Sequence, residues 1–303
     1  MRSETMTGNR LRAIIGSGFH AIPGIYDVLT ACLIERLGFA ALYLPGNALG
    51  LQLGAGQPLV TLTETVDATR RIAGALNVPL IVDAGAGFGA EIHVHRTVRE
   101  LSSAGAAAIH IDDQPYPKQA AYHAGNGRVA HADELAAKLR TAKAARGEGD
   151  MLLIARSDVW KVTGSIEETI RRAQIYVEAG ADALMILNLP AEHSATVRDA
   201  VPQTPLIWFA TPSDAPPPAG DLAAAGFSLG LYPFDAIAAA AQAVVATWRD
   251  FATSGVPLRP DVSIRSTVKL VQEAIGMDHY LDIEALRLSG RNDVADGDRG
   301  SDT

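Results

Sequence analysis

The sequence predicts an α/β fold and, within that class, a (β/α)8 barrel of the TIM type. Eight short apolar segments alternate along the chain with longer amphipathic ones. The interiors of the apolar segments, such as VPLIVD, AAIHID and MLLIAR, carry few polar residues, which is typical of parallel strands that are buried on both faces. A chain of 303 residues, 48% of them hydrophobic, has the size of one such barrel.

The eight predicted strands follow one another at short intervals along the chain. We expect them at residues 20–24, 40–45, 79–83, 107–112, 151–156, 183–187, 205–209 and 228–232. Between them, the segments at 62–76, 94–104, 132–145 and 166–179 have apolar residues at helical spacing. Strands and helices that alternate in this way form a parallel sheet with the helices as crossovers.

Glycine residues mark the turns from helix to strand. Four phrases, RLGFAALYL, SAGAAAIHI, EAGADALMI and AAGFSLGLY, end a helix at Gly and begin a strand shortly after it. Glycine after the last helical turn adopts the left-handed conformation that such a sharp turn needs. An open, doubly wound sheet would show the same turns and is the alternative. The number of strands favours a closed barrel.

The chain continues beyond the last predicted strand with elements that a barrel does not need. We expect a long Ala-rich helix at 234–251, a Pro-flanked segment at 255–260, and helices at 262–275 and 280–286. These helices should pack on the barrel or on a neighbouring subunit. Residues 1–287 are therefore expected to form one barrel domain with a helical extension, and the polar segment 288–303 to be a disordered tail.

The composition argues against several classes of function. The formal net charge of −8 does not suit a nucleic-acid partner. Cys32 is the single cysteine, so the chain forms neither an internal disulfide nor a multi-thiolate metal site. The first residues lack the apolar core of a signal peptide, and no apolar run reaches the roughly 20 residues that cross a bilayer. We expect a soluble, cytoplasmic protein without membrane contact.

Polar side chains stand where the predicted strands end, and barrel enzymes carry their active sites at these ends. Asp83 ends the third strand, Asp112 the fourth and Arg156 the fifth. At one barrel mouth, Arg156 could bind an anion, while the carboxylates could hold a metal ion or transfer protons. The alternative is that these acids only cap the following helices.

The segment after Asp112 is a candidate lid. It reads DDQPYPKQAAYHAGNGRVAH, and a long loop at a barrel mouth often closes over the substrate. Closure would bring Lys118 and His123 to the site, although a solvated connection would have the same composition. The glycines of DAGAGFG have GxGxG spacing, which is not the dinucleotide fingerprint. No nucleotide or other organic cofactor is expected.

Together these motifs resemble the isocitrate lyase and phosphoenolpyruvate mutase superfamily. The resemblance is carried by PGIYDVLTACLIERLGFAALYLPGNALG, VDAGAGFG, LLIARSD and IEETIRRAQIYVEAGADAL, and it extends in order over residues 10–287. It implies a barrel whose last helix is exchanged between the subunits of a dimer or tetramer. It also implies small 2-oxo acid or hydroxy-diacid substrates and an enolate bound to Mg²⁺.

The sequence departs from the family pattern at the metal site. Where the family motif reads D-A-D-T-G-Y-G, Asp83 is kept but Gly85 replaces the second acid. Gly56 replaces a further acid, and Asp112 stands in place of a Glu. The resemblance therefore implies that Asp83 and Asp112 hold Mg²⁺, through water molecules and more weakly than in the family.

The substrate pocket is expected to differ as well. Leu187 stands at a family Glu position, and a family Asn falls at or next to Phe209, beside Trp208. A less polar pocket disfavours a fully charged substrate, so we expect a substrate with a bulkier or more apolar arm. The lid reads KQAAYH where the family lyases have K-[KR]-C-G-H. Cys-dependent cleavage of isocitrate is therefore not expected, and the oxaloacetate decarboxylase-like branch is closer.

By resemblance, the backbone amides of Gly46 and Asn47 bind the substrate carboxylate together with Arg156. The resemblance also implies the catalytic residues Tyr43, Asp83, Asp112, Lys118 and Arg156. The candidate lid adds His123 to them, and we expect substrate contacts from Leu187, Trp208 and Phe209. We expect a divergent carbon–carbon lyase that decarboxylates or cleaves a 2-oxo acid or a related enolisable carboxylate as a homo-oligomer. The alternatives are a metal-independent enzyme of specialised metabolism in the same barrel and a non-catalytic, ligand-binding barrel.

Overall fold

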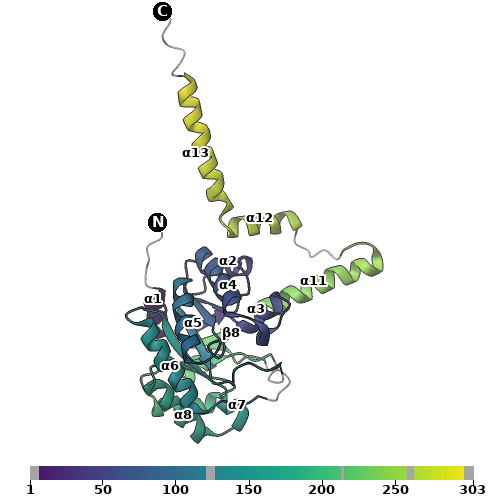
Figure 1. Cartoon of the computed structure of the whole chain (residues 1–303). Coiled ribbons are helices and arrows are strands. Elements are labelled where there is room, and N and C mark those ends of the chain that lie inside the picture. The colour runs from purple at the N-terminus through teal and green to yellow at the C-terminus, as the bar shows by residue number, and fades with distance from the viewer. Residues whose placement is uncertain (1–6, 121–126, 213–214, 258–262, 297–303) are drawn as a thin grey trace, which may run out of the picture. The chain divides into compact units, whose positions relative to one another are not determined.

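The chain folds as the predicted (β/α)8 barrel. The computed structural model describes residues 7–120, 127–212, 215–257 and 263–296. Eight parallel strands form one sheet in the order β1-β8-β7-β6-β5-β4-β3-β2. Helices lie around this sheet (Figure 1). The two ends of this order, β1 and β2, meet through an isolated bridge between Gly24 and Tyr43. The bridge brings the sheet close to a closed barrel, which confirms the predicted fold class.

The strands lie at the predicted segments. They are β1 (His20–Pro23), β2 (Leu42–Leu44), β3 (Leu80–Asp83), β4 (Ala108–Asp112), β5 (Leu152–Ser157), β6 (Ala183–Ile186), β7 (Leu206–Phe209) and β8 (Leu229–Tyr232). Each strand is short and apolar because both of its faces are covered.

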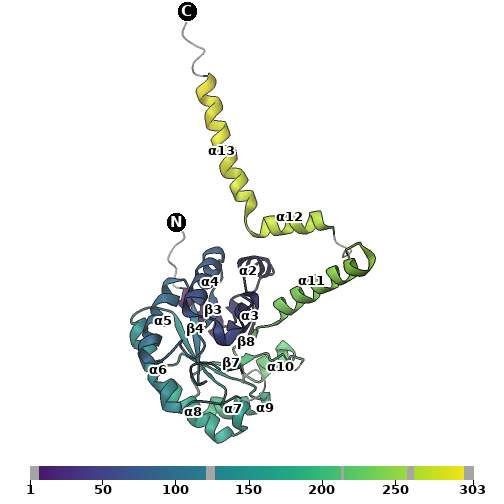
Figure 2. The same cartoon turned by 45° about the vertical axis from the view of Figure 1, so that its right-hand side comes forward.

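Helices connect successive strands and surround the sheet (Figure 2). They are α1 (Thr7–Gly16), α2 (Val28–Glu35), α3 (Gly46–Gln52), the 3₁₀ turn η1 (Gln57–Leu59), α4 (Leu62–Ala75), α5 (Glu91–Ser103), α6 (Ala132–Arg146), α7 (Val159–Thr163), α8 (Ile166–Glu178), α9 (Ala191–Ala200) and α10 (Ala219–Ala224). Side chains at their N-termini define where several of them begin. Thr61, for example, forms a reciprocal capping box with Glu64 at the start of α4.

The core has two layers because successive strand residues point to opposite sides of the sheet. The inward-facing residues, such as Ile81 and Ile154, form one buried apolar cluster, to which α1 adds Leu11. The outward-facing residues, such as Val82 and Leu153, pack against the surrounding helices in a second cluster. This packing holds the strand ends in fixed positions around the barrel mouth.

The chain divides into two compact units, Met1–Ala243 and Val244–Thr303. Helix α11 (Asp235–Ser254) crosses the division, and α12 (Ile264–Ala274) and α13 (Met277–Asp296) follow it. Helix α13 is longer than the helix expected at 280–286, and it continues to Asp296 through part of the segment expected to be disordered. The rest of that segment lies outside the described residues. The exchange of the last helix between subunits stays a prediction.

None of the described helices is both long and apolar enough to span a bilayer.

Candidate active site

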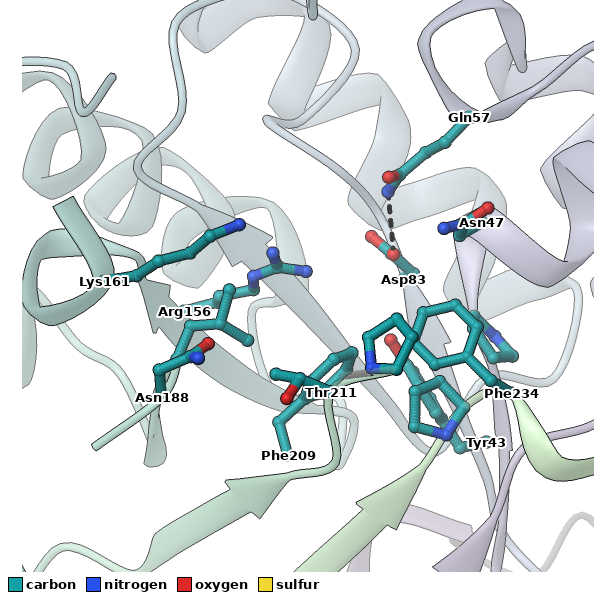
Figure 3. A pocket seen from close by; sticks show the side chains of 14 residues that line it. Tyr43, Asn47, Gln57, Asp83, Arg156, Lys161, Asn188, Phe209, Thr211 and Phe234 are labelled. Atoms are coloured by element: carbon teal, nitrogen blue, oxygen red, sulfur yellow. Dashed lines mark hydrogen bonds between the residues drawn. The ribbon is translucent and has the colours of Figure 1, made fainter. Parts of the chain in front are cut away.

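A pocket of about 370 Å³ lies where the sequence predicts the active site, at the carboxyl ends of the strands (Figure 3). Its volume suits a small organic ligand. Side chains that follow or end β2, β3, β5, β6, β7 and β8 line it. Among the residues of the lining are the predicted site residues Tyr43, Asn47, Asp83, Arg156, Leu187 and Phe209.

A smaller pocket of about 50 Å³ adjoins the first, with which it shares Asp83 and Gln57. The predicted residues Gly46 and Lys118 line this second pocket. Asp112 joins the group because its carboxylate forms an ion pair with Lys118. The structure therefore brings together the predicted residues at the ends of β3, β4 and β5.

Trp208 was expected to contact the substrate but does not line either pocket. The ring of Trp208 packs against Tyr232, with ring centroids 5.7 Å apart. Neighbouring residues of a strand point to opposite sides, and Phe209 is the one that faces the pocket. His123 lies outside the described residues.

Asp83 is buried and its carboxylate is bound by the protein on both oxygens. Oδ2 accepts hydrogen bonds from the N–H of Gly46 at 3.0 Å and from Nε2 of Gln57 at 3.2 Å. Oδ1 accepts one from the N–H of Gly85 at 2.8 Å. The N–H of Gly46, which the resemblance gives to the substrate carboxylate, is thus engaged with Asp83.

The charge state of Asp83 follows from its surroundings. Burial alone would raise the pKa of this carboxyl, but His110 when protonated, Lys118 and Arg156 outweigh burial and hold the pKa well below its usual value. Asp83 is therefore a carboxylate at neutral pH.

Asp112 and Lys118 form a nearly buried ion pair beside Asp83. The side chain of Lys118 is 9% exposed and that of Asp112 is fully buried. Nζ of Lys118 donates to Oδ2 of Asp112, and the N–H of Gln114 donates to Oδ1 at 3.3 Å. The ammonium thus lies beside one of the two carboxylates that the resemblance gives to a metal ion.

Arg156 reaches the pocket from β5 and is held in one orientation. Its Nε donates to Oδ1 of Asp158 at 2.9 Å, and its Nη2 donates to Oδ2 at 3.3 Å. The guanidinium carbon lies 5.4 Å from the centre of the Phe209 ring, a cation–π distance. Gln114 fixes Asp158 in turn, because its Nε2 donates to Oδ2 at 2.7 Å.

Tyr43 and His110 form a buried polar pair on β2 and β4. The Tyr43 hydroxyl lies 2.8 Å from Nε2 of His110, and the same nitrogen lies 3.6 Å from Oδ1 of Asp83. Burial lowers the pKa of His110 to about 4 against the attraction of Asp83, so the imidazole is neutral at neutral pH. Burial also raises the pKa of Tyr43 well above its usual value.

Asp113, the other acid at the end of β4, has a structural role. Its Oδ2 accepts hydrogen bonds from Ser157 at 2.7 Å, Arg172 at 3.0 Å and Tyr176 at 3.0 Å. Its Oδ1 accepts the N–H of Asp158 at 2.9 Å. These contacts give Asp113 a role in holding the ends of β4 and β5 against α8.

Several pocket residues were not singled out from the sequence. Gln57 follows directly on Gly56, the position where the family has an acid, and this adjacency is a usable signal. His110 is the polar residue inside the apolar phrase AAIHID, which is a second signal. Lys161 and Asn188 also line the pocket, but they lie on connections after the strands, where the sequence has no periodic pattern to place them.

Comparison with known proteins identifies the family of the chain. The family model for phosphoenolpyruvate phosphomutase matches residues 11–252. The chain belongs to the phosphoenolpyruvate phosphomutase family. This membership confirms the resemblance to the isocitrate lyase and phosphoenolpyruvate mutase superfamily.

Members of the family that are similar along most of the chain include lyases and decarboxylases. The chain is 32% identical to 2,3-dimethylmalate lyase of Eubacterium barkeri over 288 residues, which are 89% of this chain and 93% of the relative. It is 31% identical to oxaloacetate decarboxylase of Bradyrhizobium diazoefficiens over 88% of this chain and 92% of the relative. A solved structure of phosphonopyruvate hydrolase with oxalate and Mg²⁺ superposes with a TM-score of 0.80 and 27% identity, over 93% of this chain and 99% of that chain.

Proposed function

We propose that this member of the family is a carbon–carbon lyase that acts on a 2-oxo acid through an enolate. Decarboxylation of an oxaloacetate-like diacid is the reaction that the site fits best. The observation that carries the proposal is the pocket in which Arg156, held by Asp158, shares one cavity with the carboxylate of Asp83. The lyase and the decarboxylase among the relatives support the same class of reaction.

Arg156 is the group that binds the carboxylate next to the 2-oxo group. A guanidinium that is already oriented loses little freedom when it binds a carboxylate. Its contacts with Asp158 and Phe209 provide that orientation. Lys161 lies on the rim of the same pocket, to which it offers a second positive charge.

In the proposed reaction, the bond between C3 and the distal carboxylate carbon breaks. Its electron pair forms the C2–C3 double bond of an enolate, the negative charge moves to the C2 oxygen, and CO₂ leaves. The enolate then takes a proton at C3 to give the shorter 2-oxo acid. Donors that face the C2 oxygen stabilise the charge as it develops.

Tyr43 supplies one neutral donor to this oxygen. A proton on Nε2 of His110 is favoured because that nitrogen lies between the Tyr43 hydroxyl and Oδ1 of Asp83. With Nε2 donating to Tyr43, the hydroxyl proton of Tyr43 is directed to the substrate. The raised pKa of Tyr43 keeps this hydroxyl protonated.

The substrate has an apolar substituent on its 2-oxo acid frame. Leu187, Phe209 and Phe234 line the pocket together with three prolines, Pro45, Pro212 and Pro233. A charged group placed against these side chains would lose hydration without gaining a partner. An alkyl group at C3 would instead gain burial, at roughly 0.8 kcal/mol per methylene.

Magnesium does not fit the residues at this site as they stand. Three hydrogen bonds from the protein take most of the acceptor sites of the Asp83 carboxylate, and Asp112 is paired with Lys118. Among the residues that the structure describes, no group of three His, Cys, Asp or Glu side chains could hold a metal ion. The proposed reaction therefore has no step that passes through Mg²⁺, although Asp83 and Asp112 stand at the positions of family ligands.

Turnover of a substrate series tests the proposal. The full chain is incubated with oxaloacetate and its 3-methyl and 3-ethyl analogues, and CO₂ release is measured above the uncatalysed rate. We expect turnover of all three acids, with the higher kcat/KM for the alkylated ones. Stabilisation of the protein by these acids without turnover would instead favour the ligand-binding alternative.

Arg156→Lys gives a matched test of the binding group. We expect kcat/KM to fall by about 100-fold, because lysine keeps the charge but loses the oriented planar fork. Arg70→Lys is the control, since Arg70 is a surface residue that pairs with Asp67. Equal kcat/KM in Arg156→Lys and wild type would remove Arg156 from the site.

A further inference from the structure

We infer that the ammonium of Lys118 takes the place of a divalent cation beside Asp83 and Asp112, so that this chain binds its oxo-acid ligand without metal. The part that concerns the ligand rests on the proposed function. The part that concerns the cation rests on the geometry around Gly85, on the charges of three side chains and on the space available.

The absence of a side chain at Gly85, where the family has an acid, makes room for Lys118. A Cβ atom at Gly85 would lie 3.3 Å from Cε of Lys118 and 3.6 Å from its Nζ. A side chain at position 85 would therefore begin in contact with the end of the lysine. The absence of a side chain leaves that space to Lys118.

The charges complete this arrangement. Asp83 and Asp112 are buried carboxylates, and two such groups near one another need a positive charge to stay ionised. Lys118 supplies it, since its Nζ pairs directly with Asp112 and its charge lowers the pKa of Asp83. A cation that is part of the chain thus performs the charge compensation that a bound ion would otherwise provide.

The space beside the ammonium is small. Gly46, Gln57, Asp83, Gly85 and Lys118 all line the pocket of about 50 Å³. Lys118 already pairs with Asp112 there, and Mg²⁺ usually keeps several of its waters when it binds. A Mg²⁺ ion that bound both Asp83 and Asp112 would have to displace the ammonium of Lys118.

The test measures ligand binding and metal binding separately by titration calorimetry. Oxalate serves as the probe, since it mimics the enolate of a 2-oxo acid. For the wild-type chain we expect the same oxalate Kd in EDTA and in excess Mg²⁺, and no heat from Mg²⁺ alone. An oxalate Kd that improves tenfold or more with Mg²⁺ would overturn the inference.

Three variants show whether lysine and metal compete for one position. Lys118→Met should lose at least tenfold in oxalate affinity in EDTA and regain it when Mg²⁺ is added. Gly85→Asp/Lys118→Met should bind Mg²⁺ more tightly still, since aspartate is among the residues that tolerate the positive φ of +53° at position 85. Lys269→Met, at a lysine whose side chain is 77% exposed, is the matched control and should behave as wild type.

The outcomes separate this inference from the proposed function. If Lys118→Met loses affinity that Mg²⁺ does not restore, the lysine does not stand in for a cation and the inference fails. If no 2-oxo acid is turned over, the proposed function fails. In that case, titration with Mg²⁺ alone still tests whether Lys118 occupies the position of a divalent cation. It is carried out on the wild type and on Gly85→Asp/Lys118→Met.

Discussion

At the scale of single residues, the charged groups of the pocket are held by the protein itself. Asp158 orients Arg156, three N–H donors bind Asp83, and Asp112 holds Lys118. Groups that are fixed before the ligand arrives need little rearrangement when charge develops on the substrate, which is the basis of electrostatic preorganisation.

Lys161 differs from these groups because it stands exposed on the rim of the pocket. We predict that Lys161→Met weakens the binding of a dicarboxylate such as oxaloacetate by up to about fivefold, since an exposed ion pair contributes at most about 1 kcal/mol. Binding of the monocarboxylate pyruvate should change little. Equal losses for the two acids, measured by calorimetry with Lys269→Met as the control, would show that Lys161 does not recognise the distal carboxylate.

His110 makes the stability of the fold depend on pH. Its pKa in the folded chain is lowered to about 4 by burial, below the value of about 6.5 in an unfolded chain. The neutral form is therefore favoured by folding, and the stabilisation is present above pH 6.5 and is lost as the pH falls toward 4. We predict a loss of up to about 3 kcal/mol in the free energy of unfolding over this range, since one pKa unit corresponds to about 1.4 kcal/mol.

Urea unfolding of wild type and His110→Gln at several pH values measures this dependence. The quantity to compare is the difference in the free energy of unfolding between the two proteins, because Asp113 titrates in the same pH range. Burial raises the pKa of Asp113 to about 6, so its contribution to stability increases as the pH falls, opposite to that of His110. We expect wild type to lose stability relative to His110→Gln as the pH falls. A difference that stays constant with pH would mean that His110 does not titrate there.

At the scale of elements, helix α8 is tied to the ends of two strands through Asp113. Arg172 and Tyr176 lie one turn apart on α8, and both donate to Asp113 at the end of β4. Arg172 also donates to the carbonyl oxygen of Ala130 at 2.9 Å, at the end of the long loop after β4. One helix thus anchors both the strand ends and the connection that carries Lys118.

Removing the contacts of α8 with Asp113 should lower the free energy of unfolding, and the loss should be larger when a buried charge is left without a partner. We predict that Arg172→Met lowers the free energy of unfolding by about 3 kcal/mol, because it leaves the carboxylate of Asp113 buried without a cation. Tyr176→Phe should cost about 2 kcal/mol, because the lost hydroxyl donates a hydrogen bond to the charged carboxylate of Asp113. Chemical unfolding measures both, and a smaller loss for Arg172→Met than for Tyr176→Phe would contradict this ranking.

The barrel could be predicted from the sequence because its signals are local. Apolar strands such as 79–83 and the glycine turns recur along the chain, and the rule that places active sites at strand ends then selects Asp83, Asp112 and Arg156. The partners of these side chains depend on contacts between distant segments. That Gly46 donates to Asp83, or that Asp158 orients Arg156, requires the path of each connection, which no periodic pattern encodes.

The strand period explains one further difference in the pocket. The sequence could not fix the strand register finely enough to choose between Trp208 and Phe209, although they are adjacent. If the register of β7 shifted by one residue, Trp208 would face the pocket in place of Phe209. The register of β7 with β8, which pairs Phe209 with Leu231, settles which ring lines it.

At the scale of the whole molecule, the C-terminal unit carries apolar side chains that its own packing does not bury. Val244, Trp248 and Phe251 lie at helical spacing on α11 and are 59%, 59% and 44% exposed. Residues spaced in this way form one stripe along a helix. Exposed stripes of this kind mark surfaces that pack against another protein, in agreement with the homo-oligomer expected from the resemblance.

We predict that the chain sediments as a dimer or tetramer and that Trp248→Glu shifts it toward the monomer. The charge would have to be buried in the interface without a partner, which is costly. Arg249→Glu places the same residue on the same helix outside the stripe and should leave the assembly unchanged. Analytical ultracentrifugation over a range of protein concentrations compares the two variants, and a monomeric wild type would refute the prediction.

The junction between β1 and β2 makes one stretch of the barrel wall weaker than the rest. The other neighbouring strands share at least two paired positions, as β6 and β7 do, whereas β1 and β2 share the bridge at Gly24 and Tyr43. On heating, β1 and β2 should separate before the other neighbouring strands do. Tyr43 is part of this junction, so the Tyr43 hydroxyl would move out of the pocket while the remaining strands are still paired. Loss of activity on heating would then precede unfolding of the barrel. The highest temperature at which the enzyme is active would be set by the junction between β1 and β2 and not by the stability of the core.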